Sequence, residues 1–264
     1  MGNDNPKKIN ADFSVAFVGS GNVAHHFISL FKKAGFLISG LHSRNVETGQ
    51  KLALENQIPF ISSLSEIQAD LVYVCIKDQQ VEEVVKSISH QTSLVAYTAG
   101  SIELKNFDEE NVAVFYPLQT FSKNRDLTVE AIPILLETKS KEICNFLQEI
   151  AKKVGFESYY CDSTARQKVH LSAVFLNNFT HHLIQISSDL ATKSNLDWQM
   201  FEPLLKETAA KWEQKEFLEN QTGPARRNDI NVIEKHLNQL EGMNKAVYSV
   251  LTESIRKTYW NEEL

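Results

Sequence analysis

The chain has 264 residues, of which 42% are hydrophobic, enough for one large or two small domains with real cores. Its net charge of -6 comes from 33 acidic and 27 basic residues spread along the chain, which gives no support to binding of nucleic acid or of a membrane surface and favours a small-molecule partner. No run approaches about 18 apolar residues. The leader 1–12 is polar and expected to be flexible, so we expect no membrane span and a cytoplasmic protein.

The three cysteines, Cys75, Cys144 and Cys161, are odd in number and lack the spacing of metal ligands. We expect reduced thiols in or near the core, and no metal site.

The first element after the leader is a buried strand over 13–18 that ends in two glycines and restarts as a helix over 23–33. Gly19 suits the tight turn, and the missing side chain of Gly21 lets the backbone approach a pyrophosphate. The phosphates would lie at the start of the helix, where unpaired N–H groups favour an anion. We therefore predict a dinucleotide site formed by Gly19, Ser20, Gly21, Asn22 and Val23. The alternative is a purely structural glycine turn.

The second predicted strand, 36–41, is followed by Ser43 and Arg44 where an NAD site usually carries an acidic residue for the ribose hydroxyls. A hydroxyl and a guanidinium can instead bind a 2′-phosphate. One charge-assisted contact contributes roughly 1.5–3 kcal/mol, or about 10- to 150-fold in cofactor preference. The pair therefore favours NADP. The alternative is a solvated arginine in a loop.

Strand and helix patterns continue to alternate up to residue 161. Apolar runs lie at 71–76, 94–97, 112–116, 132–136 and 156–160, and helical patterns lie at 46–56, 80–88 and 139–153. This alternation predicts an α/β fold, a Rossmann-like and mostly parallel sheet over 13–161 with helices on both faces.

Ligands of such sheets bind at the carboxyl ends of the strands, so the segments that follow strands are searched for chemistry. Ile76 and Lys77 would border the cofactor, and Ser101 and Gln119 are candidate substrate contacts. For each of these loops alone, a structural turn is an equally good interpretation.

From residue 162 onward the sequence predicts an all-α domain, 162–264. Helical patterns cover 163–192 and 199–218, and two more follow Pro224. The first helix would be roughly 45 Å long. A helix of that length in so small a domain is expected to pack against a partner chain.

His170 and Asn177 are the candidate catalytic residues. On an uninterrupted 3.6-residue repeat, His170, Asn177 and His181 lie within about 20° of one line, a polar stripe in an apolar segment. With a reference pKa near ~6.5, a histidine can give a proton to a carbonyl oxygen or an imine nitrogen. The alternative is a structural histidine.

A second dense motif covers 221–229. Thr-Gly-Pro makes a turn into a helix, with Pro224 in its first turn, and Arg226 and Arg227 would bind a carboxylate or phosphate of the substrate. The alternative is a helix start with solvated arginines.

Six segments together resemble a known family: 18–24, 42–44, 98–101, 116–121, 170–179 and 222–229. They are similar to two-domain, Rossmann-like NADP oxidoreductases with an uncharacterised C-terminal helical domain. More distantly the chain resembles pyrroline-5-carboxylate reductases and the 6-phosphogluconate and β-hydroxyacid dehydrogenase superfamily. The resemblance implies NADP in the first domain, a substrate against the C-terminal helices and a homodimer through those helices.

The chain departs from these relatives at two motifs. β-Hydroxyacid dehydrogenases carry a catalytic lysine with an asparagine four residues on, whereas His170 is followed at that spacing by Val174. The glycine- and threonine-rich turn of the pyrroline-5-carboxylate reductases is replaced by the arginine-bearing one. Reduction of a ketone or imine, with His170 as proton donor, fits these residues better than a lysine mechanism or proline synthesis.

We therefore expect an NADP(H)-dependent oxidoreductase that transfers a hydride to or from a small, anionic carbonyl, hydroxy-acid or imine substrate. The competing hypothesis is a non-catalytic NADP-binding sensor whose helical domain serves assembly. An S-adenosylmethionine enzyme is a weaker third, because Ser43 and Arg44 replace the acidic residue expected at the ribose.

Overall fold

The computed structural model describes residues 9–10, 12–125 and 132–260, so most of the predicted leader lies outside the described residues. The chain divides into two compact units, Met1–Asn178 and Phe179–Leu264. The predicted domain boundary at 161/162 stays a prediction, and the helix that begins at Ser163 is part of the first compact unit up to Asn178. Within the described ranges, no helix is both long and apolar enough to cross a membrane.

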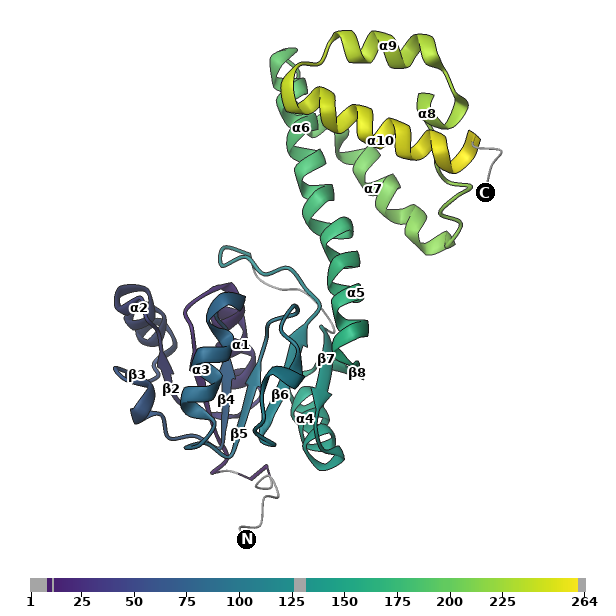
Figure 1. Cartoon of the computed structure of the whole chain (residues 1–264). Helices are drawn as coiled ribbons and strands as arrows, with labels where there is room; N and C mark the ends of the chain where they lie inside the picture. Colours follow the sequence, from purple (N-terminus) through teal and green to yellow (C-terminus); the bar gives the residue numbers. More distant parts are fainter. Residues whose placement is uncertain (1–8, 11, 126–131, 261–264) are drawn as a thin grey trace. The chain divides into compact units, whose positions relative to one another are not determined.

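The first unit contains an eight-stranded sheet in the order β3-β2-β1-β4-β5-β6-β7-β8 (Figure 1). The strands are β1 (Ser14–Val18), β2 (Leu37–His42), β3 (Phe60–Ile61), β4 (Leu71–Val74), β5 (Leu94–Tyr97), β6 (Val112–Pro117), β7 (Pro133–Thr138) and β8 (Glu157–Tyr160). Strands β1 to β6 are parallel, β7 is antiparallel to β6, and β8 is parallel to β7. The predicted mostly parallel α/β sheet is confirmed. Only the two-residue β3 has no counterpart in the predicted strands.

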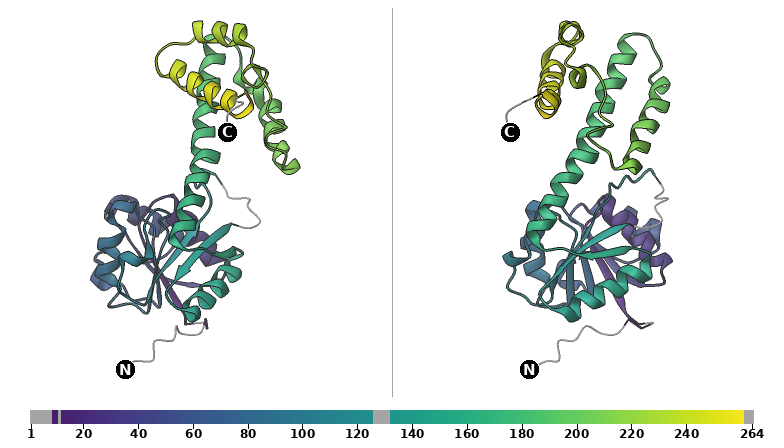
Figure 2. Two further views of the ribbon diagram at one scale, coloured as in Figure 1. Left: turned by 45° about the vertical axis from the view of Figure 1, so that its right-hand side comes forward. Right: turned by 90° about the vertical axis from the view of Figure 1, so that its right-hand side faces the viewer.

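Helices cover both faces of this sheet, as predicted (Figures 1 and 2). On one face, α1 (Asn22–Lys33), α2 (Val46–Asn56) and α4 (Lys141–Val154) pack on a core rich in phenylalanine. On the other face, α3 (Val81–Ile88) packs on valines of the central strands. Strand residues alternate between these two cores because successive side chains point to opposite faces.

The strand order reverses beside β1, whose neighbours are β2 on one side and β4 on the other. In open α/β sheets, ligands bind in the crevice at the carboxyl ends of the strands at such a switch point. The segments that follow Val18 and Val74 therefore border the expected ligand site.

The long helix expected over 163–192 is not a single α-helix. It consists of α5 (Ser163–Ala173), a π-helical segment (Val174–Phe179) and α6 (Thr180–Lys193). A π turn takes more residues than an α turn, so the 3.6-residue phase is not kept across it. The predicted common line of His170, Asn177 and His181 assumed an uninterrupted α-helix and is wrong for that reason.

The second unit is helical over its described residues, as expected for an all-α domain. After α6 it contains α7 (Glu202–Ala210), α8 (Pro224–Arg227), α9 (Ile230–Asn238) and α10 (Gly242–Trp260), with short 3-10 turns at Trp198–Phe201 and Lys211–Gln214. The expected helix 199–218 is thus broken into shorter pieces. Leucines and aromatic residues of α6, α7 and the turn between them line a cavity of about 550 Å³.

The cysteines are free, with Cys75 and Cys144 buried and Cys161 half-buried. The predicted reduced core or near-core thiols are confirmed.

Candidate active site

The glycine turn after β1 is held in a conformation that needs glycine at Gly19. Its φ is +114°, and a Cβ there would overlap the carbonyl oxygen of Cys75, which follows β4. The Gly19 amide donates to the carbonyl oxygen of His42 at 2.8 Å. The turn is therefore locked between the ends of β2 and β4.

Gly21 differs, because neither its backbone conformation nor its packing requires a glycine. Its φ of -78° is open to any residue, and no atom lies closer than 4.0 Å to the place of a Cβ. The residue precedes α1, which has no side-chain cap and no acidic residue in its first turn. Open space above uncapped N–H groups fits a pyrophosphate that approaches the backbone closely.

A cluster of three hydroxyl groups lies beside this turn. Ser20 Oγ is 2.8 Å from Ser43 Oγ and 2.8 Å from Thr48 Oγ1. Ser43 is buried, whereas Arg44 is exposed and has no ion pair within the described part of the chain. Of the predicted pair, Arg44 is thus the accessible charge, and Ser43 is a buried hydroxyl that contacts Ser20. Sequence reasoning missed Thr48.

The remaining predicted cofactor residues differ in their exposure and contacts. Asn22 Nδ2 donates to the carbonyl oxygen of Phe121 at 2.7 Å, which ties α1 to the segment after β6. Val23 and Ile76 are partly buried against the two cores of the sheet. Lys77 is exposed at the start of the turn after β4.

Asp78 and Ser101 join the loops after β4 and β5. The Ser101 hydroxyl donates to the carboxylate of Asp78. Ser101 was a predicted site residue, whereas Asp78 was not among the predicted site residues. The contact thus connects polar side chains of two neighbouring loops, those after β4 and β5.

His170 lies at the carboxyl end of β6, next to Tyr116. Tyr116 Oη and His170 Nδ1 are 2.9 Å apart, and the two rings meet edge to face. Gly100 lies against both rings, since a Cβ on it would be 2.9 Å from the Tyr116 ring and 3.0 Å from His170 Nδ1. Sequence patterns did not pair Tyr116 with His170, because the two are 54 positions apart.

The environment of Tyr116 favours its neutral form. Burial raises its pKa, the negative charge of Asp78 adds to the rise, and Arg166 opposes it. The hydroxyl therefore keeps its proton at neutral pH.

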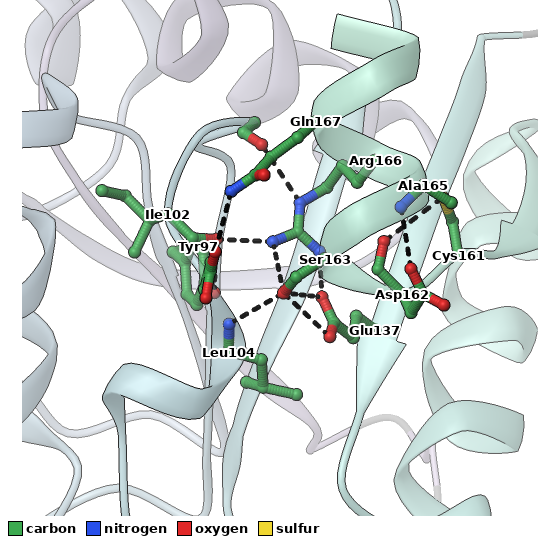
Figure 3. A network of polar contacts seen from close by, with 12 residues as sticks. Tyr97, Ile102, Leu104, Glu137, Cys161, Asp162, Ser163, Ala165, Arg166 and Gln167 are labelled. Atoms are coloured by element: carbon green, nitrogen blue, oxygen red, sulfur yellow. Dashed lines mark hydrogen bonds and ion pairs between the residues drawn. The ribbon is translucent and has the colours of Figure 1, made fainter.

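Arg166 fixes α5 to the sheet one turn before His170 (Figure 3). Its guanidinium pairs with Glu137 of β7 and donates to the carbonyl oxygens of Gly100 and Ile102. Ser163, the first residue of α5, donates to Glu137 and accepts from the amide of Leu104 at 3.2 Å. The network was not predicted, because the feature that marks it is the complete burial of Arg166 where an apolar residue is usual. Burial is not visible in the sequence.

The structure also describes the other predicted site residues. Asn177 is exposed on the π-helical segment, and Gln119 accepts a local hydrogen bond from the amide of Thr120. Arg226 and Arg227 belong to the second unit. Pro224 does begin a helix there, as predicted, but α8 has a single turn and gives little dipole. The Arg226 guanidinium stacks over the Tyr259 ring at 4.1 Å, and Arg227 is exposed.

The fold and the glycine turn match known families. Residues 14–100 match the family described as NADP oxidoreductase, coenzyme F420-dependent, and residues 132–255 match a domain of unknown function, DUF2520. The chain is similar to the crystal structure of a "putative NADP oxidoreductase" from Bacteroides fragilis, with 34% identity, a TM-score of 0.87, and coverage of 94% of this chain and 99% of that one.

Two further comparisons are more distant. A Plasmodium falciparum pyrroline carboxylate reductase with NADP bound shares the fold, with 14% identity and a TM-score of 0.60 over 93% of this chain and 98% of that one. A shikimate dehydrogenase-like protein of Haemophilus influenzae is 38% identical over 64 residues, which are 24% of either chain. That match thus spans about a quarter of the curated relative.

These observations define a dinucleotide-binding oxidoreductase fold. The chain belongs to the family of NADP oxidoreductases that carry a C-terminal DUF2520 domain, the family of the Bacteroides fragilis protein. The resemblance drawn from the sequence motifs is confirmed, and with it the class of enzyme, an NADP-dependent oxidoreductase.

Proposed function

We propose that this enzyme transfers a hydride between NADP(H) and a small anionic carbonyl, hydroxy-acid or imine substrate. The observation that carries the proposal is the contact between His170 and Tyr116 at the carboxyl end of β6, in the same unit as the open glycine turn. A titratable side chain and a phosphate-binding turn at one edge of a parallel sheet are the parts that such a reaction needs.

The cofactor would be held by residues of the glycine turn and of the loops after β2 and β4. The backbone around Gly19 and Gly21 would bind the pyrophosphate, and Ser43 and Arg44 would bind the 2′-phosphate. Asn22, Val23, Ile76 and Lys77 would line the same cleft. When bound, NADP(H) supplies or accepts the hydride.

His170 would hold or release the proton that accompanies the hydride. An imidazole ring can give a proton to a carbonyl oxygen or imine nitrogen in one direction and take one up in the other. Asn177, Ser101 and Gln119 would supply further polar contacts to the substrate. Ser101 is supported by its bond to Asp78 beside the Gly100 loop.

The negative charge of the substrate would be bound by Arg226 or Arg227. Support comes from two guanidinium groups on one short helix, of which that of Arg227 is exposed. An arginine fork binds a carboxylate or phosphate with two parallel hydrogen bonds.

The protein would act as a homodimer through its C-terminal helices. The support is a surface rich in large apolar side chains on the second unit, where Trp198 is 44% exposed, Leu204 64% and Met243 74%. Exposed large apolar side chains, where they gather into a patch, are typical of interfaces. Sedimentation velocity at micromolar concentration tests it, and a single species at the monomer mass of 30.0 kDa would refute it.

Isothermal titration of the purified chain with NADPH and with NADH tests the cofactor assignment. We expect tighter binding of NADPH, and a loss of about 10- to 150-fold in that preference in Arg44→Ala. Lys51→Ala, on the exposed side of α2, is the matched control and should bind as the wild type does. Equal affinity for both cofactors would refute the 2′-phosphate assignment.

Turnover on a panel of keto acids, hydroxy acids and cyclic imines tests the catalytic half. We expect His170→Ala to lose at least about 100-fold in kcat with NADPH affinity unchanged. Activity that survives this substitution would remove His170 from the mechanism.

A further inference from the structure

We propose that Tyr116 is a positioning residue that fixes neutral His170 in the tautomer with its proton on Nε2, so that Nε2–H is presented to the substrate as a hydrogen-bond donor. The tautomer follows from the contact itself. The role of Nε2 in turnover rests on the proposed function.

The geometry allows one hydrogen bond between the two side chains. Tyr116 Oη lies 2.9 Å from His170 Nδ1, a normal distance for a single shared proton. In a neutral imidazole, one ring nitrogen carries the proton and the other accepts. If the tyrosine donates, Nδ1 is the acceptor and the proton of the ring must be on Nε2.

The charges around the pair favour the tyrosine as donor. The groups that face it are the carboxylate of Asp78, held by Ser101 on the loop after β5, and the guanidinium of Arg166, whose charge is offset by its partner Glu137. Burial and Asp78 raise the pKa of Tyr116, so the phenol stays protonated through neutral pH. A protonated phenol donates to the nearest available lone pair, which is that of Nδ1.

The packing holds this pairing in place. The two ring centroids are 5.8 Å apart with planes at 76°, and Gly100 closes the space beside them so tightly that even a methyl group would crowd both rings. Arg166 donates to the carbonyl oxygen of the same Gly100 at 3.2 Å. The imidazole is therefore oriented from two sides, by the phenol at Nδ1 and by the glycine loop.

The arrangement gives the two ring nitrogens separate tasks. Nδ1 is occupied by a protein partner, and Nε2 remains for the substrate. A histidine whose tautomer is fixed by its other hydrogen bond presents Nε2–H as a donor to the substrate oxygen or nitrogen that becomes negative as the hydride arrives. Removal of the phenol hydroxyl should therefore slow turnover without abolishing it.

The test is ¹⁵N NMR of the histidine rings in the full chain at alkaline pH, where histidine rings are neutral. The His170 signal is assigned by its loss in His170→Gln. We expect the shifts of a protonated Nε2 and an accepting Nδ1 in the wild type, and a mixture of tautomers in Tyr116→Phe. Tyr97→Phe is the matched control. It removes a hydroxyl on the neighbouring strand β5 that donates to the carbonyl oxygen of Ile102 at 3.2 Å, and it leaves Tyr116 and His170 in place. Its His170 signal should be that of the wild type.

A proton on Nδ1 in the wild type, or unchanged shifts in Tyr116→Phe, would overturn the proposal. For turnover we expect Tyr116→Phe to lose about 3- to 10-fold in kcat, the loss of one hydrogen bond, with unchanged NADPH affinity. A complete loss of turnover with an unchanged tautomer would assign Tyr116 to the substrate instead and would also overturn it. Because the NMR measurement needs neither cofactor nor substrate, it stands even if the proposed reaction fails.

Discussion

Arg166 and Glu137 form an ion pair beneath the first turn of α5, with the side chain of Arg166 fully buried and that of Glu137 only 12% exposed. The pair joins the helix that carries His170 to β7, and the same guanidinium reaches the loop of Gly100. The position of the candidate catalytic histidine therefore depends on a buried charge one helical turn away.

Arg166→Met should destabilise the first unit by about 3–5 kcal/mol, because it leaves the Glu137 carboxylate buried without its partner. Urea unfolding followed by circular dichroism measures the change. The double variant Arg166→Met, Glu137→Leu should recover most of the loss. Gln167→Ala is the control, since this neighbour is exposed and its side chain donates to Glu103. A loss below about 1 kcal/mol in the single variant would contradict the role assigned to the pair.

The two glycines of the turn after β1 should respond differently to alanine. Gly19→Ala meets the Cys75 carbonyl at a positive φ and should cost at least about 1–3 kcal/mol of unfolding free energy. Gly21→Ala has both the space and an ordinary φ, so this change at the N-cap of α1 should cost no more than about 1 kcal/mol. NADPH affinity should nevertheless fall by about tenfold or more, because the methyl group occupies the place proposed for the pyrophosphate. Thermal melts and calorimetric titration separate the two effects, and unchanged affinity in Gly21→Ala would count against that placement.

Gly100→Ala should separate the Tyr116 and His170 rings. The added methyl group lies 2.9 Å from one ring and 3.0 Å from the nitrogen of the other, too close for both to stay. We expect a loss of about 1–3 kcal/mol in stability and a larger fall in kcat than in NADPH affinity. Steady-state kinetics beside binding measurements check this, and wild-type kcat in the variant would show that the contact is dispensable.

Stability should fall at alkaline pH through Cys75. Burial raises the pKa of its thiol from an ordinary 9.0 to about 12. Below pH 9 both states keep the proton, but as pH rises from 9 toward 12 the unfolded chain releases a proton that the folded chain retains. This group should therefore reduce the unfolding free energy by about 1.4 kcal/mol at pH 10. Urea titrations between pH 8 and pH 10 should show a shallower decline in Cys75→Ala, and equal slopes would refute the assignment.

Leu204→Glu should weaken self-association of the chain. Leu204 is 64% exposed on α7 and borders the cavity between α6 and α7, so a carboxylate there would be buried in the proposed interface. Sedimentation velocity should show a shift toward monomer, whereas Lys206→Gln, on the same helix, should sediment as the wild type does. A mass unaffected by Leu204→Glu would place the interface elsewhere.

The first unit could be predicted closely from sequence because its signals are local. The helix over Val46–Asn56 and the strand over Leu94–Tyr97 have the predicted bounds, since periodicity and capping fix them. The π-helical segment was missed, because an α pattern and a π pattern of apolar residues look alike over six positions.

The candidate site was predicted only in part. Gly19 and His170 could be found from residue type and spacing, but the partners of His170 come from β6 and the loop after β5. The antiparallel turn of the chain into β7, which places Glu137 under α5, rests on tertiary packing that single-sequence patterns do not carry.

The reversal of β7 and β8 also decides which part of a helix reaches the ligand edge. Arg166 contacts Glu137, which pairs with Val114 in the middle of β6. His170 contacts Tyr116, which lies two residues nearer the carboxyl end of β6. Helix α5 therefore runs toward the carboxyl end of β6 between Arg166 and His170. Helix α1, by contrast, begins at that edge and offers it amide groups. The two helices thus run in opposite directions relative to this edge. Helix α1 offers it backbone dipoles that suit anionic phosphates, and α5 offers it the imidazole side chain of His170.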